Sequence, residues 1–202
     1  VHHRIKNNLQ GVAGLLQQNA ARHPELAEML SEAVGQVQAI AQVYGLQVGV
    51  SGPLRVASLL RAIAQSVQRT FARTITVDAG SQEVAHLLPE AEAIPIALTL
   101  NELFTNAIKH GQGDVRCTLG PAGEGVRIAI ASRAQLKTGF DFAQMRSGVS
   151  GLGLVRALLP RRSTAMTLLQ QGDEVQATLD LKPPSVRPPE ADGAAAPAPS
   201  AA

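Results

Sequence analysis

Apolar residues recur at helical spacing through the first fifty positions of the chain, which predicts two helices. Residues 1–22 form the first, and a break at residues 22–24 separates it from the second, over residues 25–48. The apolar seam of the first helix consists of Ile5, Leu9, Val12 and Leu16. The seam of the second consists of Leu26, Leu30, Ala33, Val37, Ile40 and Tyr44. One hairpin of this size cannot bury both seams alone, so we expect a homodimer that forms a four-helix bundle.

After a hinge at residues 51–53, helical periodicity alternates with the two-residue periodicity of strands. Helices are predicted at 55–71 and 152–159, and a central helix follows Pro89 and includes the strongly periodic stretch 94–111. Strands are predicted at 74–79, 83–88, 114–119, 126–131, 165–170 and 174–181. Residues 120–125 read as a hairpin-like linker, and residues 132–150 lack clear periodicity. The prediction is an α+β fold in which helices pack on one face of a mixed, mostly antiparallel sheet.

These patterns divide the chain into three parts. Residues 1–50 form the helical hairpin, and residues 51–182 form a globular domain. From Pro183 onward the chain consists mostly of Pro, Ala, Gly and Ser. A segment with so few large hydrophobic residues cannot offset the entropy lost on folding, so residues 183–202 are expected to be disordered.

The composition narrows the classes of function. The net charge is +2 and charged residues make up 17% of the chain, a weak and dispersed charge that argues against nucleic-acid binding. A single cysteine, Cys117, excludes an internal disulfide, and its alternating segment predicts that it is buried. No apolar run reaches the roughly 18 residues of a transmembrane helix, so we expect no such helix in this sequence. Because the chain starts at Val1, directly before its first motif, we expect a fragment without its upstream sensor domain.

Three polar residues share one side of helix 94–111. Glu102, Asn106 and Lys109 are four and three residues apart, so they form a narrow row on the helix surface. Carboxylate and carboxamide oxygens suit Mg²⁺, which takes one or two protein ligands together with phosphates and waters. A lysine supplies a point charge for phosphate. The row is a candidate nucleotide–Mg²⁺ site, and the alternative is an ordinary solvated helix face.

Later in the chain, glycines open an apolar helical segment. Gly148, Gly151 and Gly153 lie at the start of helix 152–159. Such a turn exposes backbone N–H groups at a helix N-terminus, where phosphate binds readily. Glycines alone are a weak signal because loops often contain them. Their position after the polar row makes a phosphate site the more specific interpretation.

Two adjacent histidines near the N-terminus differ in their position on the first helix. With Ile5 set at zero, His3 falls at about 160° and His2 at about 60° around the helix axis. His3 therefore faces away from the apolar seam, and Asn7 shares its outward side. A histidine that accepts a phosphoryl group has to be accessible to the donor. Of the two, His3 is therefore the favoured candidate for such a phosphoacceptor. The alternative is that both are ordinary solvated helix residues.

These three motifs, in this order, resemble those of a known family. NELFTNAIKH (101–110) resembles the N-box, and SGLGLVRALL (150–159) the second glycine box, of the GHKL superfamily, which includes histidine kinase ATP-binding domains. HHRIKNNLQ (2–10) resembles an HWE-like phosphoacceptor box, in which the acceptor histidine is followed by Arg and, four residues on, by Asn. The resemblance spans residue 1 to residue 182 or so. It implies a dimeric phosphoacceptor hairpin followed by an α/β sandwich of the GHKL ATP-binding type.

The resemblance implies the core of a sensor histidine kinase. Such a protein phosphorylates its own histidine from ATP, with Mg²⁺, and passes the phosphoryl group to an aspartate of a response regulator. It implies His3 as the acceptor, Arg4 as a group that steadies the phosphate, Glu102 as a candidate general base and Asn106 as the Mg²⁺ ligand. The implied nucleotide-binding residues are Asn106, Lys109, His110, Gly148, Gly151, Leu152 and Gly153.

One departure from the family pattern concerns the nucleotide base. The family's first glycine box carries an Asp after a strand, and its carboxylate accepts from the adenine amino group. Here that position falls at Ser132 by strand alternation, or at Ala131 by counting back from residues 139–141. Neither residue is acidic, and Asp141 is an alternative acceptor. We therefore expect ATP to bind weakly and with reduced preference for adenine.

Two other functions remain open at this point. The altered glycine box favours a degenerate, non-catalytic scaffold or histidine phosphotransfer module with weak or absent ATP binding. The second is a serine kinase or ATPase of the same superfamily, and the phosphoacceptor hairpin argues against it.

Overall fold

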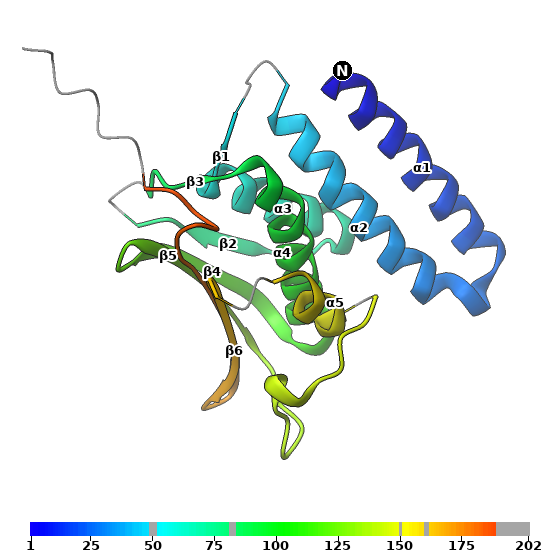
Figure 1. Cartoon of the computed structure of the whole chain (residues 1–202). Helices are drawn as coiled ribbons and strands as arrows, with labels where there is room; N and C mark the ends of the chain where they lie inside the picture. The colour runs from blue at the N-terminus through cyan, green and yellow to red at the C-terminus, as the bar shows by residue number, and fades with distance from the viewer. Residues whose placement is uncertain (49–51, 81–83, 150, 160–161, 189–202) are drawn as a thin grey trace, which may run out of the picture.

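The chain folds into an N-terminal helical hairpin followed by a domain of helices packed on one main sheet (Figure 1). This computed structural model describes residues 1–48, 52–80, 84–149, 151–159 and 162–188. Helix α1 (His2–Arg22) and helix α2 (Ala27–Leu46) are joined by the short 3-10 helix η1 (Pro24–Leu26). Both predicted helices and the break between them are confirmed, and Pro24 lies in the first turn of η1, where a proline is tolerated.

The domain contains a five-stranded mixed sheet in the order β2-β4-β5-β7-β6. Strands β2 and β4 are parallel, and the other neighbours are antiparallel. The strands are β2 (Ile75–Asp78), β4 (Gln112–Ala122), β5 (Gly125–Arg133), β6 (Thr164–Gln171) and β7 (Glu174–Leu181). The helices are α3 (Val56–Phe71), α4 (Glu90–His110), α5 (Gly151–Leu158) and the 3-10 helix η2 (Phe142–Gln144). A separate pair, β1 (Leu54–Arg55) with β3 (Leu87–Leu88), completes the predicted α+β fold.

Alternation along the central strands separates a core face from an open face. In β4, Val115, Cys117 and Leu119 are buried whereas Arg116 and Thr118 between them are exposed, as the two-residue period requires. The buried face meets α3 and α4, which lie on the same side of the sheet (Figure 1). Burial also raises the pKa of the Cys117 thiol to about 12, so the predicted buried cysteine is a neutral side chain.

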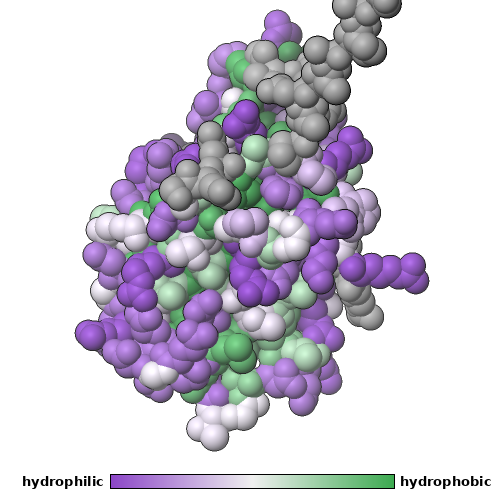
Figure 2. Space-filling model, turned by 90° about the vertical axis from the view of Figure 1, so that its left-hand side faces the viewer, coloured by the Kyte–Doolittle hydropathy of each residue, from purple (hydrophilic) through white to green (hydrophobic). Residues whose placement is uncertain are grey.

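The open face carries cross-strand ion pairs. Arg127 donates to both carboxylate oxygens of Asp180, at 2.7 and 2.8 Å, and Arg116 donates to Glu174 at 2.6 Å. Seen from the left-hand side of Figure 1, the surface of the molecule is mostly hydrophilic (Figure 2). The sheet therefore presents charge to solvent on one face and its apolar side chains to the helices on the other.

Helix α4 starts at Glu90, directly after Pro89 as predicted, and its acidic first turn suits a helix N-terminus. Other element boundaries differ from prediction. Of the strand predicted at 83–88, the described part forms only β3. The predicted linker 120–125 is mostly strand: Ala122 pairs with Gly125, and Gly123 takes a positive φ of 61° in a two-residue turn.

The start of the C-terminal tail was wrongly predicted. Val186 is fully buried in the core and Ser185 is 1% exposed. The backbone of Arg187 pairs with that of Leu87 at 2.8 and 2.9 Å, and Ser185 Oγ lies 2.7 Å from Ser163 Oγ. Composition averaged over the tail hides one anchoring valine, so the ordered chain extends beyond residue 182. The rest of the predicted disordered tail, 189–202, lies outside the described residues.

Helix α2 is shared between the hairpin and the domain. Its Ala39 and Val43 belong to the domain core, and a Cβ at Gly35 would stand 3.2 Å from Asn101 Nδ2 of α4. The chain thus buries part of α2 against its own α3 and α4. The sequence alone predicts that the apolar side of α2 is covered by the hairpin and a second protomer. The large apolar residues of the hairpin that stay exposed are Val1, Val12, Leu15, Leu26 and Met29. None of the described helices is both long and apolar enough to cross a membrane.

Candidate functional site

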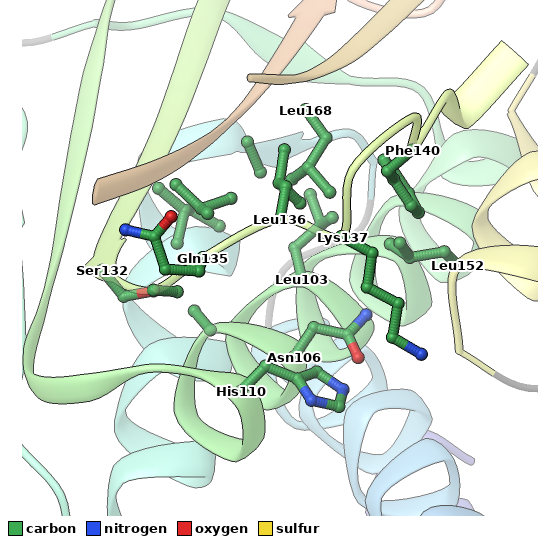
Figure 3. A pocket seen from close by; sticks show the side chains of 15 residues that line it. Leu103, Asn106, His110, Ser132, Gln135, Leu136, Lys137, Phe140, Leu152 and Leu168 are labelled. Atoms are coloured by element: carbon green, nitrogen blue, oxygen red, sulfur yellow. The ribbon is translucent and has the colours of Figure 1, made fainter. Parts of the chain in front are cut away.

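A cavity of about 370 Å³ lies between α4, β5, the segment after β5 and the start of α5. Its walls are largely apolar, and they come from all of these elements and from strands β6 and β7 (Figure 3). The apolar wall residues include Leu103, Ile130, Leu136, Phe140, Leu152, Leu168 and Ala177. A slot of this size and lining is typical of a site for a flat organic ligand.

Polar groups stand at two ends of this cavity. Figure 3 shows Ser132 and Gln135 at one end, and Asn106, His110 and the Lys137 amino group at the other. The second end brings together a carboxamide, an imidazole and an ammonium group, which are suited to phosphate and its counter-ion. The cavity is therefore polar–apolar–polar along its length.

Asn106 is the member of the predicted row that faces the cavity. Its Nδ2 atom is buried and has no hydrogen-bond partner among the described residues. A buried amide without a partner is costly in a protein that binds nothing there. Rotation of the carboxamide by half a turn presents its oxygen instead, and the assignment of the two atoms is a choice of orientation. One amide oxygen, with phosphates and waters for the remaining ligands, fits the requirements of Mg²⁺.

The predicted row is split between two neighbours of α4. Lys109 does not line the cavity but pairs with Glu32 at 3.6 Å and Glu28 at 3.9 Å on α2. On a helix, positions 102, 106 and 109 span about 60°. The boundary between α2 and the cavity falls inside this arc, so Asn106 and His110 turn to the cavity while Lys109 turns to α2.

Glu102 also turns to α2. It is 4% exposed, accepts from Gln36 Nε2 at 3.3 Å and accepts from the backbone N–H of Gly151. Desolvation raises the pKa of the Glu102 carboxyl, and the hydrogen bond from Gln36 opposes this shift. Because Gln36 Nε2 also donates to the Val149 carbonyl at 3.3 Å, these contacts hold the glycine turn against α2. The general base expected at Glu102 does not line the cavity.

The glycine turn is closely packed at Gly153. The Gly148 N–H donates to the Gly153 carbonyl at 3.0 Å. A Cβ at Gly153 would stand 3.0 Å from Gly148 N and 3.2 Å from Arg146 O. Gly151 begins α5 with a positive φ of 58°, a conformation that glycine adopts without strain. The next residue, Leu152, reaches into the cavity (Figure 3).

The structure decides among the three positions considered for the missing acid. Ser132 lines the cavity and is 3% exposed, whereas Ala131 does not line it. The Asp141 carboxylate accepts from the Ala143 N–H at 2.8 Å and from Gln144 Nε2 at 3.0 Å, so it caps η2. Among the residues that line the cavity there is no acidic side chain.

Sequence reasoning missed Gln135, Lys137 and Phe140, which also line the cavity. They belong to residues 132–150, where the absence of periodicity gave no signal. The segment is nevertheless held in place, because Gln170 Nε2 donates to the Ala134 carbonyl at 3.1 Å and Gln170 Oε1 accepts from the Leu136 N–H at 2.8 Å.

The two histidines lie at the N-terminus of α1, beside the C-terminal part of α2, and their environments differ. His3 is exposed, as are Arg4 and Asn7. His2 is partly buried, with its ring 5.8 Å from the ring of Tyr44 on α2. Along α2, Tyr44 lies about 12 Å from Gln36, which contacts the glycine turn. On one chain, the candidate acceptor is therefore displaced from the glycine turn by about two helical turns along the axis of α2.

Comparisons with known proteins point to one family. Residues 1–71 match the histidine kinase model HisKA_2. The chain is 27% identical over 169 residues to the sensor histidine kinase PdtaS of Mycolicibacterium smegmatis, covering 79% of this chain and 34% of that protein. It is 33% identical over 120 residues to PdtaS of Mycobacterium tuberculosis, covering 54% of this chain and 23% of that protein. The chain thus spans about a third or less of the curated relatives it matches.

Solved structures share the fold. The histidine kinase domain of the Erythrobacter litoralis EL346 blue-light activated histidine kinase superposes with a TM-score of 0.63 at 18% identity, over 90% of this chain and 88% of that one. Full-length ShkA in complex with AMPPNP superposes with a TM-score of 0.54 at 19% identity, over 94% of this chain and 45% of that one. The N-terminal third of the chain therefore matches a histidine kinase family model, and the chain as a whole has the fold of these solved histidine kinase domains.

Proposed function

We propose that this chain is the catalytic core of a sensor histidine kinase that transfers the γ-phosphoryl group of ATP to His3. The observation that carries the proposal is Asn106, whose buried and unpartnered amide faces a nucleotide-sized cavity beside the glycine turn. The AMPPNP complex of the structurally similar ShkA supports a nucleotide as the ligand. A site that consumes ATP is expected on the cytoplasmic side of the cell.

Phosphoryl transfer depends on positioning and on neutralising charge. Asn106 would hold Mg²⁺, which would neutralise charge on the β- and γ-phosphates. Lys137 and His110 stand at the same end of the cavity and supply positive charge or hydrogen bonds (Figure 3). The backbone N–H groups of Leu152 and Gly153 would donate to a phosphate at the start of α5, whereas the N–H of Gly151 already bonds to Glu102.

The acceptor is the neutral imidazole of His3. One ring nitrogen forms a bond to the γ-phosphorus while the bond from phosphorus to the ADP oxygen breaks, and the imidazole proton is lost afterwards. Arg4, next to the acceptor and exposed, steadies the phosphate, and Asn7 lies one helical turn further. The phosphoryl group then passes to an aspartate of a response regulator.

His3 and the cavity have to approach each other before transfer. Two routes exist, a movement of the domain along the hairpin or the use of the cavity of a second protomer. The exposed apolar residues Val12 and Leu15 of α1, with Leu26 and Met29 across the hairpin, offer a surface for that second protomer. We therefore include a homodimer in the proposed function.

The test is incubation of the purified chain with γ-labelled ATP and Mg²⁺. The expected label is lost in acid and kept in base, as phosphohistidine requires. Asn106→Leu should lose both nucleotide binding and label, whereas His3→Gln should lose only the label. A wild-type chain that binds neither ATP nor another nucleoside triphosphate would contradict the proposal.

A second candidate is a phosphotransfer module that keeps the fold without using ATP. The observation that favours it is the lining of the cavity, in which the described residues include the neutral Ser132 and no acidic side chain. A module of this kind takes its phosphoryl group from a phosphorylated receiver domain. It would become labelled by that donor and not by ATP, which separates the two candidates.

A further inference from the structure

Two neutral side chains line the end of the cavity that is opposite Asn106, His110 and Lys137. Ser132 is 3% exposed, and the Gln135 carboxamide stands beside it (Figure 3). The Gln135 side chain forms no hydrogen bond with any other described residue. Its donor and acceptor atoms are therefore available to a ligand in the cavity.

Gln135 is held between two fixed residues. The Ala134 N–H donates to the Asp173 carbonyl at 3.1 Å, and the Gln170 carboxamide bonds to the backbone of both Ala134 and Leu136. Gln170 Nε2 donates further to the carbonyls of Gly172 and Glu174, at 2.9 and 3.1 Å. The segment is thus attached to the β6–β7 hairpin, so the backbone position of Gln135 does not depend on a ligand.

The polar, apolar and polar regions follow one another along the cavity, and this order determines which way round a nucleotide would bind. Its phosphates match the end with Asn106, His110 and Lys137, and its flat base matches the apolar walls. The edge of the base then meets Ser132 and Gln135. Both side chains carry a donor and an acceptor on one group, whereas a carboxylate accepts only.

We propose that Gln135, together with Ser132, reads the edge of the base, and that the site accepts adenine and guanine nucleotides with little discrimination. Adenine presents an amino donor next to a ring-nitrogen acceptor. Guanine presents a carbonyl acceptor next to a ring N–H donor. Because the Gln135 amide can rotate by half a turn and the Ser132 hydroxyl can rotate freely, the same two residues complement either edge. This inference rests on the proposed nucleotide site and adds its specificity.

The experiment is calorimetric titration of the full chain with Mg²⁺ and three ligands: ATP, GTP and purine riboside triphosphate. The last has the ring but no exocyclic donor or acceptor. For wild type we expect ATP and GTP affinities within about tenfold of each other, and weaker binding of the purine analogue. Gln135→Leu should weaken ATP and GTP by roughly three- to tenfold, the range for a neutral hydrogen bond, and should weaken the analogue less, because the analogue keeps only the ring-nitrogen acceptor. Gln65→Leu is the matched control, since Gln65 is exposed on α3 and outside the cavity.

The possible outcomes distinguish a failure of this inference from a failure of the proposed function. If wild type binds ATP more than about a hundredfold better than GTP, or if Gln135→Leu binds all three ligands as wild type does, the inference is wrong while the nucleotide site stands. If wild type binds none of the three, the proposed function itself fails. The comparison of the three ligands on wild type keeps the test decisive even if Gln135→Leu does not fold.

Discussion

Neighbouring residues in this chain differ more in their surroundings than in their chemistry. His2 rests on the Tyr44 ring and His3 faces solvent, because one residue step turns the helix by about 100°. The same reasoning separates Ala131 from Ser132 on β5, where one step changes the face of the sheet. In both pairs, accessibility to a reaction partner follows from the backbone period.

Substitution of the two histidines tests the acceptor. His3→Gln should abolish acid-labile phosphate after incubation with labelled ATP, because the accessible imidazole is removed. His2→Gln should keep substantial label, since that ring packs on α2. Nucleotide binding, measured separately, should be unchanged in both variants. Label that survives in His3→Gln and disappears in His2→Gln would assign the acceptor to His2.

The buried carboxyl of Glu102 predicts a pH-dependent stability. A carboxyl with a raised pKa binds its proton more tightly in the folded than in the unfolded chain, so the free energy of unfolding falls as pH rises from the ordinary value of 4.5 through the raised one. Glu102→Gln should remove this fall and keep an oxygen for Gln36 and Gly151. We expect its melting temperature to equal or exceed that of wild type at neutral pH.

Thermal melts between pH 4 and 8, the range about the ordinary carboxyl pKa, measure this effect. Glu124→Gln, in the exposed β4–β5 turn, is the matched control and should follow the wild-type curve. A Glu102→Gln chain that is several degrees less stable at neutral pH would show that the negative charge stabilises the glycine turn.

At the scale of elements, α4 and α2 each serve two neighbours. Helix α4 presents Asn106 to the cavity and Lys109 to α2, while α2 contributes to the hairpin and to the domain core. A single apolar seam on α2 is therefore an incomplete description, since Ala39 and Val43 are buried by the domain. What remains unburied on the hairpin lies mainly on α1 and near the loop.

The exposed apolar side of the hairpin predicts dimerisation through α1. Leu15 is 62% exposed on one chain, so Leu15→Glu should not disturb the folded protomer. A glutamate buried between two protomers costs several kcal/mol unless it is paired. We therefore expect light scattering to give twice the chain mass for wild type and the single mass for Leu15→Glu, with unchanged circular dichroism.

Leu169→Glu is the matched control for that variant. Leu169 is 55% exposed but lies on β6, away from the hairpin, and its substitution should leave the dimer intact. A wild-type chain that remains monomeric at micromolar concentration would remove the homodimer from the proposed function.

At the scale of the whole molecule, the end of the described chain closes the domain. Residues 183–188 run beside β3, and Val186 occupies the core together with Leu88 and Leu181. The segment links the end of the sheet to the β1–β3 pair at the start of the domain. Its removal therefore affects packing in two places.

Two truncations test this closure. Deletion of 185–202 removes Val186 and the Arg187 pairing, whereas deletion of 189–202 retains both. Loss of a buried valine side chain alone costs about 1.5–3 kcal/mol, and each kcal/mol corresponds to about 2–4 °C for a chain of this size. The longer deletion should lower the melting temperature by at least several degrees relative to the shorter one. Equal melting temperatures for the two truncations would contradict the anchoring role of Val186.

The sequence alone determined the features that depend on local periodicity. The hairpin, the alternation of β4 and β5, the outward side of His3 and the glycine turn all follow from spacings within one element. The family motifs belong to this group because each is contiguous. These features need no knowledge of what packs against an element.

Only the tertiary structure decided which neighbour each face meets. The arc that holds Glu102, Asn106 and Lys109 is divided by the edge between α2 and the cavity, and no spacing within α4 locates that edge. Gln135 and Lys137 enter the cavity because Gln170, on a distant strand, holds the segment that carries them. Val186 is buried because the backbone of the next residue, Arg187, pairs with that of Leu87 in β3. Contacts between segments far apart in sequence leave no periodic signal, and they complete both the fold and the site.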